Sequence, residues 1–190
     1  LDFIENEKGE VARSFFEKEL QLDKKGFQDI SKKNNLLLPK DICDLVYKSF
    51  GSQFVKNMGK SSVDLFLSSH FVDLLLGAKS IKDLYELFFT DIAPNYVEKN
   101  YDWKIKKIGI DYCNVSGKPS SRLIGTLGCN ETSSRPLEIL RDGFAEGLPT
   151  LLGVNNAVSH QVKSICSGDN EDEYHIYYPQ STNSFLKIIQ

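Results

Sequence analysis

Apolar residues follow two different periods along the chain, one in each half. Up to about residue 97 they recur every three or four positions, which is typical of amphipathic helices. This pattern predicts helices over residues 10–22, 39–59, 61–76 and 80–93. We expect Ser80 to cap the last of these helices and Pro94 to end it, because the residue before a proline disfavours the helical conformation.

The second half opens with the alternation of a half-buried strand. Residues 103–115 alternate, with one slip at Lys106 and Lys107 that predicts a β-bulge. The segment 116–120, SGKPS, has the composition of a turn, and residues 121–129 have the pattern of a returning strand. Together these segments predict a first hairpin.

A helix over residues 136–152 follows, and Ser133 or Ser134 is placed to cap it. Its glycines, Gly143 and Gly147, are four residues apart and therefore share one face of the helix. We expect this face to lie close against the sheet, because glycine places no side chain between the two backbones.

Two further alternating segments, residues 157–166 and 173–179, predict a second hairpin. The acidic turn between them carries Asp169, Glu171 and Asp172, which we expect to be solvated. The order of helices, hairpin, helix and hairpin predicts an α+β fold. In it, an N-terminal helical half packs on a C-terminal four-stranded antiparallel sheet, with one helix between the two hairpins.

Length and composition indicate one domain over residues 1–178, followed by a polar tail, residues 179–190, that leads to a further domain or to the terminus. The formal net charge of -3 argues against a nucleic-acid partner. No apolar run approaches the roughly 20 residues that a membrane-spanning helix needs, so we expect no membrane span.

The four cysteines are widely spaced, and none belongs to a Cys-x-x-Cys pair. This usage suits free thiols in a reducing cytoplasm. It also predicts no metal site, because zinc ligands normally come in closely spaced pairs. The Gly-x-Ser-x-Gly and His-Glu-x-x-His motifs of hydrolases are absent, so we do not expect an enzyme.

From Ser133 onward the order of features resembles one known superfamily. Ser133-x-Arg135 precedes a helix rich in small residues, and a strand, a Gly168-Asp169 turn and a last strand follow. This order resembles the end of a superfamily that includes haem-nitric-oxide/oxygen-binding (H-NOX) gas sensors, 4-vinyl-reductase-type sensor domains and TRAPP transport-particle subunits. The resemblance covers residues 40 to 178 when the helical half is included, and it implies a homodimer.

The chain departs from the H-NOX pattern at both places that hold the haem. In that family Tyr-x-Ser-x-Arg binds the haem propionates. Here Ser133 and Arg135 match, whereas Glu131 replaces the tyrosine and would repel a propionate. The family's axial histidine lies near the end of the helix before the first strand, and residues 83–97 contain no histidine. An H-NOX haem would therefore lack its anchor.

The resemblance thus favours a haem-free sensor domain that binds a small apolar or aromatic effector between helices and sheet. Binding would pass a conformational change to an output domain of the same or another protein. The candidate ligand-binding residues are His70, Phe66, Phe71, Leu75, Phe88, Trp103, Arg135 and Ser133, with Ile105 and Leu123 on the inner face of the sheet.

Two alternative functions stay open. An H-NOX-like haem gas sensor would need His70 as an unusual axial ligand. A TRAPP-like dimerising scaffold would expose an apolar helical seam, with Cys43 as a candidate for acylation. The residues themselves also suit simpler roles: His70 an ordinary core position, and Arg135 a surface ion pair with Glu131.

Overall fold

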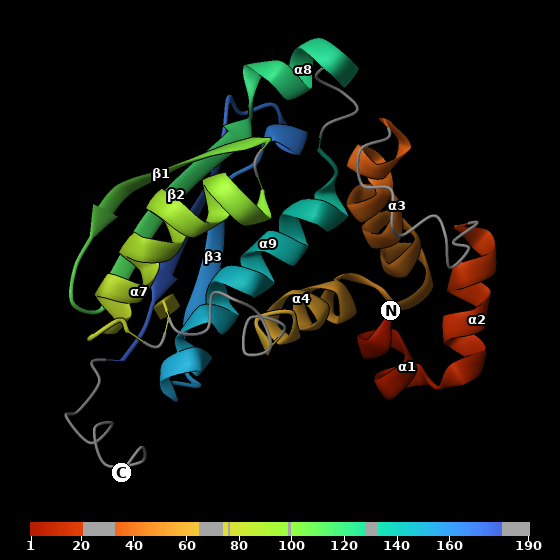
Figure 1. Ribbon diagram of the computed structural model, residues 1–190, viewed down its shortest axis with the longest axis horizontal. Helices are drawn as coiled ribbons and strands as arrows, with labels where there is room; N and C mark the ends of the chain where they lie inside the picture. Colours follow the sequence, from red (N-terminus) through yellow and green to blue (C-terminus); the bar gives the residue numbers. More distant parts are fainter. Residues whose placement is uncertain (21–32, 65–73, 76, 99, 128–132, 180–190) are drawn as a thin grey trace.

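A computed structural model of the chain describes residues 1–20, 33–64, 74–75, 77–98, 100–127 and 133–179 (Figure 1). Its C-terminal half contains a four-stranded antiparallel sheet with the strand order β1-β2-β4-β3. The strands are β1 (Tyr101–Ile108), β2 (Tyr112–Pro119), β3 (Val158–Lys163) and β4 (Asp172–Tyr177). The predicted α+β class, with N-terminal helices and a helix between two hairpins, is confirmed.

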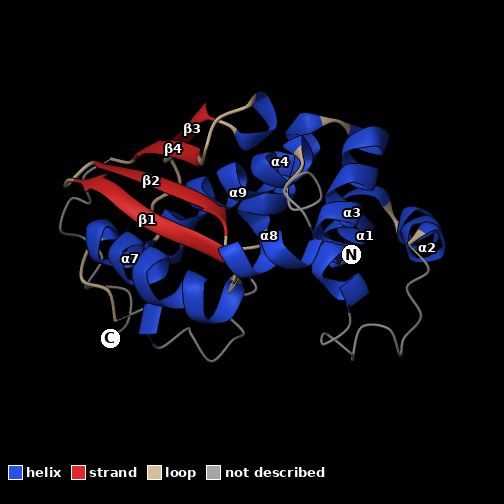
Figure 2. Ribbon diagram, turned by 90° about the horizontal axis from the view of Figure 1, so that it is seen from above, coloured by secondary structure: helices blue, strands red, loops and turns tan. Residues whose placement is uncertain are grey.

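Helices form the N-terminal half, and helices from both halves of the chain cover one face of the sheet (Figure 2). The helical elements are α1 (Asp2–Lys8), α2 (Glu10–Glu19), α3 (Lys33–Phe50), α4 (Ser52–Ser61), α7 (Ile81–Leu87), the π-helix η2 (Phe88–Val97), α8 (Ser121–Leu127), α9 (Arg135–Gly147) and the 3₁₀ turns η4 (Leu148–Leu152) and η5 (Ile165–Ser167). Element η2 contacts β1, whereas α9 contacts β3 and β4. Within the described ranges, no helix combines the length and the apolar character needed to cross a membrane.

The N-terminal helices differ from the predicted ones at two breaks. Ser80 caps α7 as predicted, because its hydroxyl accepts the Asp83 N–H at 3.1 Å. The helix predicted over residues 39–59 is instead two helices, divided at Gly51, whose φ of 83° favours glycine. Pro94 lies inside η2 rather than ending it. The wider turn of a π-helix accommodates a ring that would clash with the carbonyl four residues earlier in an α-helix.

The first hairpin has the predicted bulge but a different turn. The register shifts between Ile105 and Lys107, as the slip in alternation predicts. The chain turns at residues 109–111, and Gly117, which we expected in the turn, pairs with Trp103 inside the sheet. A Cβ at Gly117 would lie 2.9 Å from Trp103 Cε3. This glycine therefore makes room for aromatic rings on the sheet.

The returning strand predicted over residues 121–129 is wrong. Ser120 starts a helix there, because its hydroxyl accepts the Leu123 N–H at 3.3 Å and its carbonyl accepts the Ile124 N–H at 3.0 Å. Leu123 consequently lies on α8 and does not contribute to the inner face of the sheet.

Two hydrophobic clusters hold the described residues together. One lies between the sheet and the helices α7, η2 and α9, and includes Leu75, Phe88 and Ile176. The other joins α1 to α4 through Phe16 and Val46, with residues of α9 packed against it. Helix α9 therefore connects the helical half to the sheet.

The glycines of α9 face α4 and not the sheet, which corrects the prediction. A Cβ at Gly143 would lie 2.9 Å from the carbonyl carbon of Lys56, and one at Gly147 would lie 2.6 Å from the carbonyl oxygen of Lys60. Gly59 of α4 approaches the backbone of α9 in the same way. The two helices thus pack backbone to backbone, and the sheet-facing side of α9 carries larger side chains.

Candidate functional site

The structure divides the candidate ligand-binding residues into two groups. Leu75, Phe88 and Trp103 pack in or against one core cluster on the inner face of the sheet. Ser133 and Arg135 lie instead at the start of α9. Three further candidates, His70, Phe66 and Phe71, fall outside the described residues.

Phe88 and Trp103 belong to a group of aromatic rings between η2 and β1. The ring centroids of Phe88 and Phe89 are 5.2 Å apart, and those of Phe89 and Trp103 are 5.1 Å apart. Ile105 packs against the same cluster. Element η2 closes with the bond from the Glu98 N–H to the Ala93 carbonyl at 2.8 Å, which spans five residues. Such π-helical segments are rare and occur frequently at functional sites.

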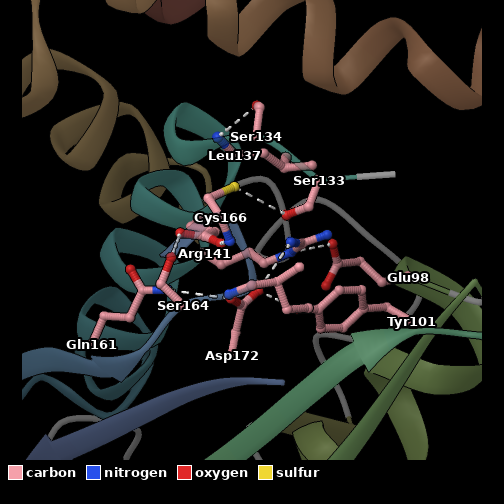
Figure 3. Close-up of polar contacts among 12 residues, drawn as sticks. Glu98, Tyr101, Ser133, Ser134, Leu137, Arg141, Gln161, Ser164, Cys166 and Asp172 are labelled. Atoms are coloured by element: carbon pink, nitrogen blue, oxygen red, sulfur yellow. Dashed lines mark hydrogen bonds and ion pairs between the residues drawn. The ribbon is translucent and has the colours of Figure 1, made fainter. Parts of the chain in front are cut away.

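A group of buried charged residues lies where the first turns of α9 face the sheet (Figure 3). Glu138 and Asp172 are 0% exposed, and Arg141 is 9% exposed. Glu138 and Arg141 are three residues apart on α9 and share one face, whereas Asp172 begins β4. We call Glu98, Tyr101, Glu138, Arg141 and Asp172 the polar cluster.

Asp172 connects five elements. Its Oδ1 accepts the Ile165 N–H at 2.9 Å and the Gln161 amide at 3.4 Å. Its Oδ2 accepts the Tyr101 hydroxyl and lies 3.8 Å from Arg141 Nη1. The carboxyl group therefore ties β4 to four other elements, namely β1, α9, β3 and η5.

Glu138 binds the same connection from the side of α9. Its Oε1 accepts the Cys166 N–H at 3.0 Å, and its Oε2 accepts the Ser164 hydroxyl at 2.7 Å. Together with Asp172 it therefore accepts two successive N–H groups at the start of η5. Free N–H groups of this kind bind external anions in other proteins; here the chain's own carboxyl groups occupy them.

Arg141 links the polar cluster to the aromatic group. Its Nε donates to Glu98 Oε1 at 2.9 Å, and its guanidinium lies 3.9 Å from the centroid of the Tyr101 ring. The second oxygen of Glu98 accepts the Trp103 indole N–H at 3.0 Å. Glu98 is also the residue that ends η2. A movement of η2 would therefore displace Glu98 and change its hydrogen bonds with both Arg141 and Trp103.

The surroundings move the pKa values of the two buried carboxyl groups in opposite directions. Burial, with a smaller contribution from the Glu138 charge, raises the pKa of Asp172 to about 6. Burial also opposes ionisation of Glu138, but hydrogen bonds from Cys166 and Ser164 outweigh it and lower the pKa of Glu138 to about 2. Between these values the pair carries one negative charge.

Ser134, and not Ser133, caps α9. The Ser134 hydroxyl accepts the Leu137 N–H at 3.4 Å. The Ser133 hydroxyl instead lies 3.9 Å from the Cys166 sulfur. Of the two serines that the sequence offered, only one thus satisfies a backbone N–H of the first turn.

Ser134→Ala should lower the free energy of unfolding by about 1 kcal/mol, because the first turn loses its side-chain acceptor. Ser133→Ala should change it by no more than about 0.5 kcal/mol, as for other substitutions at partly exposed positions. Urea denaturation of the two variants measures both values. Equal losses would contradict the assignment of the cap.

The described residues do not fit a haem. Arg135, which matches the propionate-binding arginine in the resemblance, donates to Glu138 at 3.1 Å and also to Gln161. A propionate at this guanidinium would meet the Glu138 carboxylate. His160 and His175 pair across β3 and β4 on the face opposite to the inward-pointing Ile176. In the part of the chain that is described, no group of three His, Cys, Asp or Glu side chains could hold a metal ion.

Sequence reasoning missed the polar cluster. The prediction that the acidic turn is solvated is wrong at Asp172, which is fully buried. A signal was present, because Asp172 is two residues before Tyr174 and four before Ile176, and alternate residues of a strand share a face. Both of those residues are fully buried, so Asp172 shares their inward face.

Comparison with models of known protein families finds no match to the chain, and comparison with curated proteins finds no significant match. The fold and the two residue groups described above therefore carry the functional argument.

Proposed function

We propose that this chain is a haem-free ligand-sensing domain of a cytoplasmic signalling or regulatory protein. It is not an enzyme, it forms a homodimer, and it acts on an output domain of the same or another protein. Its effector is a small apolar or aromatic molecule held between the helices and the inner face of the sheet.

The observation that carries this proposal is the π-helix η2 above Trp103. Its side chains Phe88, Phe89 and Ile92 are buried and form an apolar, largely aromatic layer between η2 and the sheet, which an effector would reach by displacing η2. An effector of the same character would bind there by burial and by ring contacts. The resemblance supports the same position, because the H-NOX branch carries its haem ligand near the end of the helix before the first strand.

The polar cluster favours a regulatory role over a catalytic one. Its carboxyl groups on α9 and β4 are fully buried and already accept hydrogen bonds from the chain itself. A substrate could not reach them without displacing η5. Glu98 would couple effector binding at η2 to the rest of the domain, because it ends η2 and pairs with Arg141 of α9. Displacement of η2 would thus move α9, which also packs against the N-terminal helices.

Trp103, the sole tryptophan of the chain, provides a direct test. Titration with phenol, toluene or naphthalene should change its fluorescence and raise the melting temperature. Phe89→Leu should weaken binding about fivefold, which corresponds to roughly 1 kcal/mol for one aromatic contact. Phe54→Leu, in the second hydrophobic cluster, serves as the control and should leave the affinity unchanged. Native mass spectrometry of the purified chain would report a retained effector and the dimer together.

The proposal fails on either of two results. The first is a chain that purifies without a bound molecule and gives neither a fluorescence change nor a thermal shift with any of the three probes. The second is an equal loss of affinity in Phe89→Leu and Phe54→Leu, which would place binding elsewhere.

A further inference from the structure

The polar cluster contains more buried acid than buried base. Glu138 and Asp172 are both fully buried, and Arg141 is the one buried guanidinium among the described residues. Arg141 is already engaged by a third carboxylate, because its Nε donates to Glu98 at 2.9 Å. Arg135 also pairs with Glu138, but its side chain is 51% exposed. Two ionised carboxyl groups at this site would therefore leave a buried negative charge without compensation, which is strongly unfavourable.

The position of Arg141 bears on how the site accommodates two buried carboxyl groups with one buried guanidinium. Its Nη1 is buried and has no hydrogen-bond partner among the described residues, although Asp172 Oδ2 is 3.8 Å away. An ionised carboxylate normally draws a guanidinium to about 2.8 Å. At 3.8 Å the two groups are within ion-pair distance but are not hydrogen-bonded, so Arg141 compensates the charge of Asp172 only in part. The Tyr101 hydroxyl, the Gln161 amide and the Ile165 N–H all donate to the same group and favour its ionised form, so burial has to outweigh them for Asp172 to hold a proton.

We propose that Glu138 and Asp172 form a proton-binding site that holds one proton between two buried carboxyl groups and releases it to the solvent as the pH rises. Release of the proton makes Asp172 a full carboxylate. Arg141 then turns toward Asp172 and is shared less with Glu98. Because Glu98 also accepts the Trp103 indole N–H, the change reaches the aromatic group. The raised pKa of Asp172 supports this proposal, and burial is its main cause.

This proton site does not rest on the proposed effector, because its tests use the chain without a ligand. The charged and titratable groups that face it come from every element packed around it. They are Arg135, Glu138 and Arg141 of α9, Tyr101 of β1, Glu98 after η2, Cys166 of η5, Tyr174 of β4 and, near Arg141 and Glu98, Cys43 of α3.

The first test follows Trp103 fluorescence between about pH 5 and about pH 7.5, a range in which histidines also titrate. Wild-type protein should show a transition with a midpoint near pH 6, as the pKa of Asp172 requires. Asp172→Asn should abolish the transition, because the amide mimics the protonated carboxyl group and cannot ionise. Asp169→Asn is the matched control: Asp169 accepts the Ser164 N–H at 2.8 Å in the same connection, but it is exposed. This control should retain the transition.

The second test follows thermal stability. A carboxyl group whose pKa is raised in the folded state stabilises the fold below that pKa, and the contribution is lost as the pH rises through it. Between about pH 5 and about pH 7 the melting temperature of wild-type protein should therefore fall about 5 °C further than that of Asp172→Asn. A simple ion pair with Arg141 predicts the opposite, namely that Asp172→Asn is least stable relative to wild type at the higher pH.

Glu138→Gln keeps the proposal testable if Asp172→Asn does not fold. Removal of the neighbouring carboxylate should ease ionisation of Asp172 and move the fluorescence midpoint down by about one pH unit. The proposal is overturned if wild-type protein shows no transition. It is also overturned if Asp172→Asn retains the transition, or if Glu138→Gln leaves the midpoint in place.

Discussion

Gly143→Ala should lower the free energy of unfolding by about 3 kcal/mol, at the upper end of the usual cost of overpacking. The added Cβ would lie 2.9 Å from the carbonyl carbon of Lys56. That neighbour is helix backbone and cannot turn aside as a flexible side chain would. Helices α4 and α9 must then separate. Their separation would also stretch the ion pair between Lys56 and Glu146, whose Nζ and Oε2 are 3.0 Å apart.

Gly125→Ala on α8 is the matched control for this substitution. A Cβ at Gly125 would meet no atom within 4 Å, and the residue lies inside a helix. Alanine is favoured over glycine there, so the free energy of unfolding should rise by about 0.5–1 kcal/mol. Urea denaturation of both variants gives the comparison. A loss of similar size at both positions would show that close packing of α4 and α9 is not the cause.

Local signals in the sequence predicted those parts of the fold that local interactions determine. The Ser80 cap needs only a hydroxyl three residues before an N–H, and the bulge near Lys107 appears directly as a slip in alternation. Gly117 shows the limit of such signals. Its neighbours have the composition of a turn, but the missing side chain leaves space for the rings of Tyr101 and Trp103 on the neighbouring strand. That use depends on a tertiary contact, which periodicity does not reveal.

The candidate site likewise has one part that the sequence predicts and one part that depends on tertiary contacts. Phe88 and Trp103 are apolar, and burial alone predicts that they share a core. The polar cluster could not be assembled in this way, because its partners are far apart in the chain: Tyr101 and Asp172 are separated by 71 residues. Charged residues are mostly exposed unless they are paired, so a sequence that does not reveal the partner predicts a surface position. Only the meeting of α9 with β1 and β4 makes the buried position of Asp172 favourable.

Arg141→Met should lower the free energy of unfolding by about 3 kcal/mol at about pH 7, because removal of one partner from a buried ion pair leaves the other charge uncompensated. Methionine fills much of the space of the arginine stem, so the loss reports mainly on charge. Arg13→Met is the control at the surface. Arg13 pairs with three carboxylates, Asp2, Glu5 and Glu17, yet its side chain is 34% exposed, against 9% for Arg141. Water can replace those pairs, so this variant should lose far less stability.

The pH dependence of Arg141→Met separates the loss of charge from the loss of packing. Without the guanidinium the charged form of Asp172 becomes still less favourable, so its pKa rises further above its ordinary value. A raised pKa in the folded state stabilises at low pH and ceases to do so as the pH rises through it. The cost of Arg141→Met should therefore be smaller at about pH 5 than at about pH 7, and Asp172→Asn in the same chain should recover part of it at the higher pH. Urea denaturation of the four chains at both pH values completes the double-mutant cycle. A cost that is the same at both pH values, with no recovery in the double variant, would mean that Arg141 stabilises the fold through its packing on Tyr101 and not through charge.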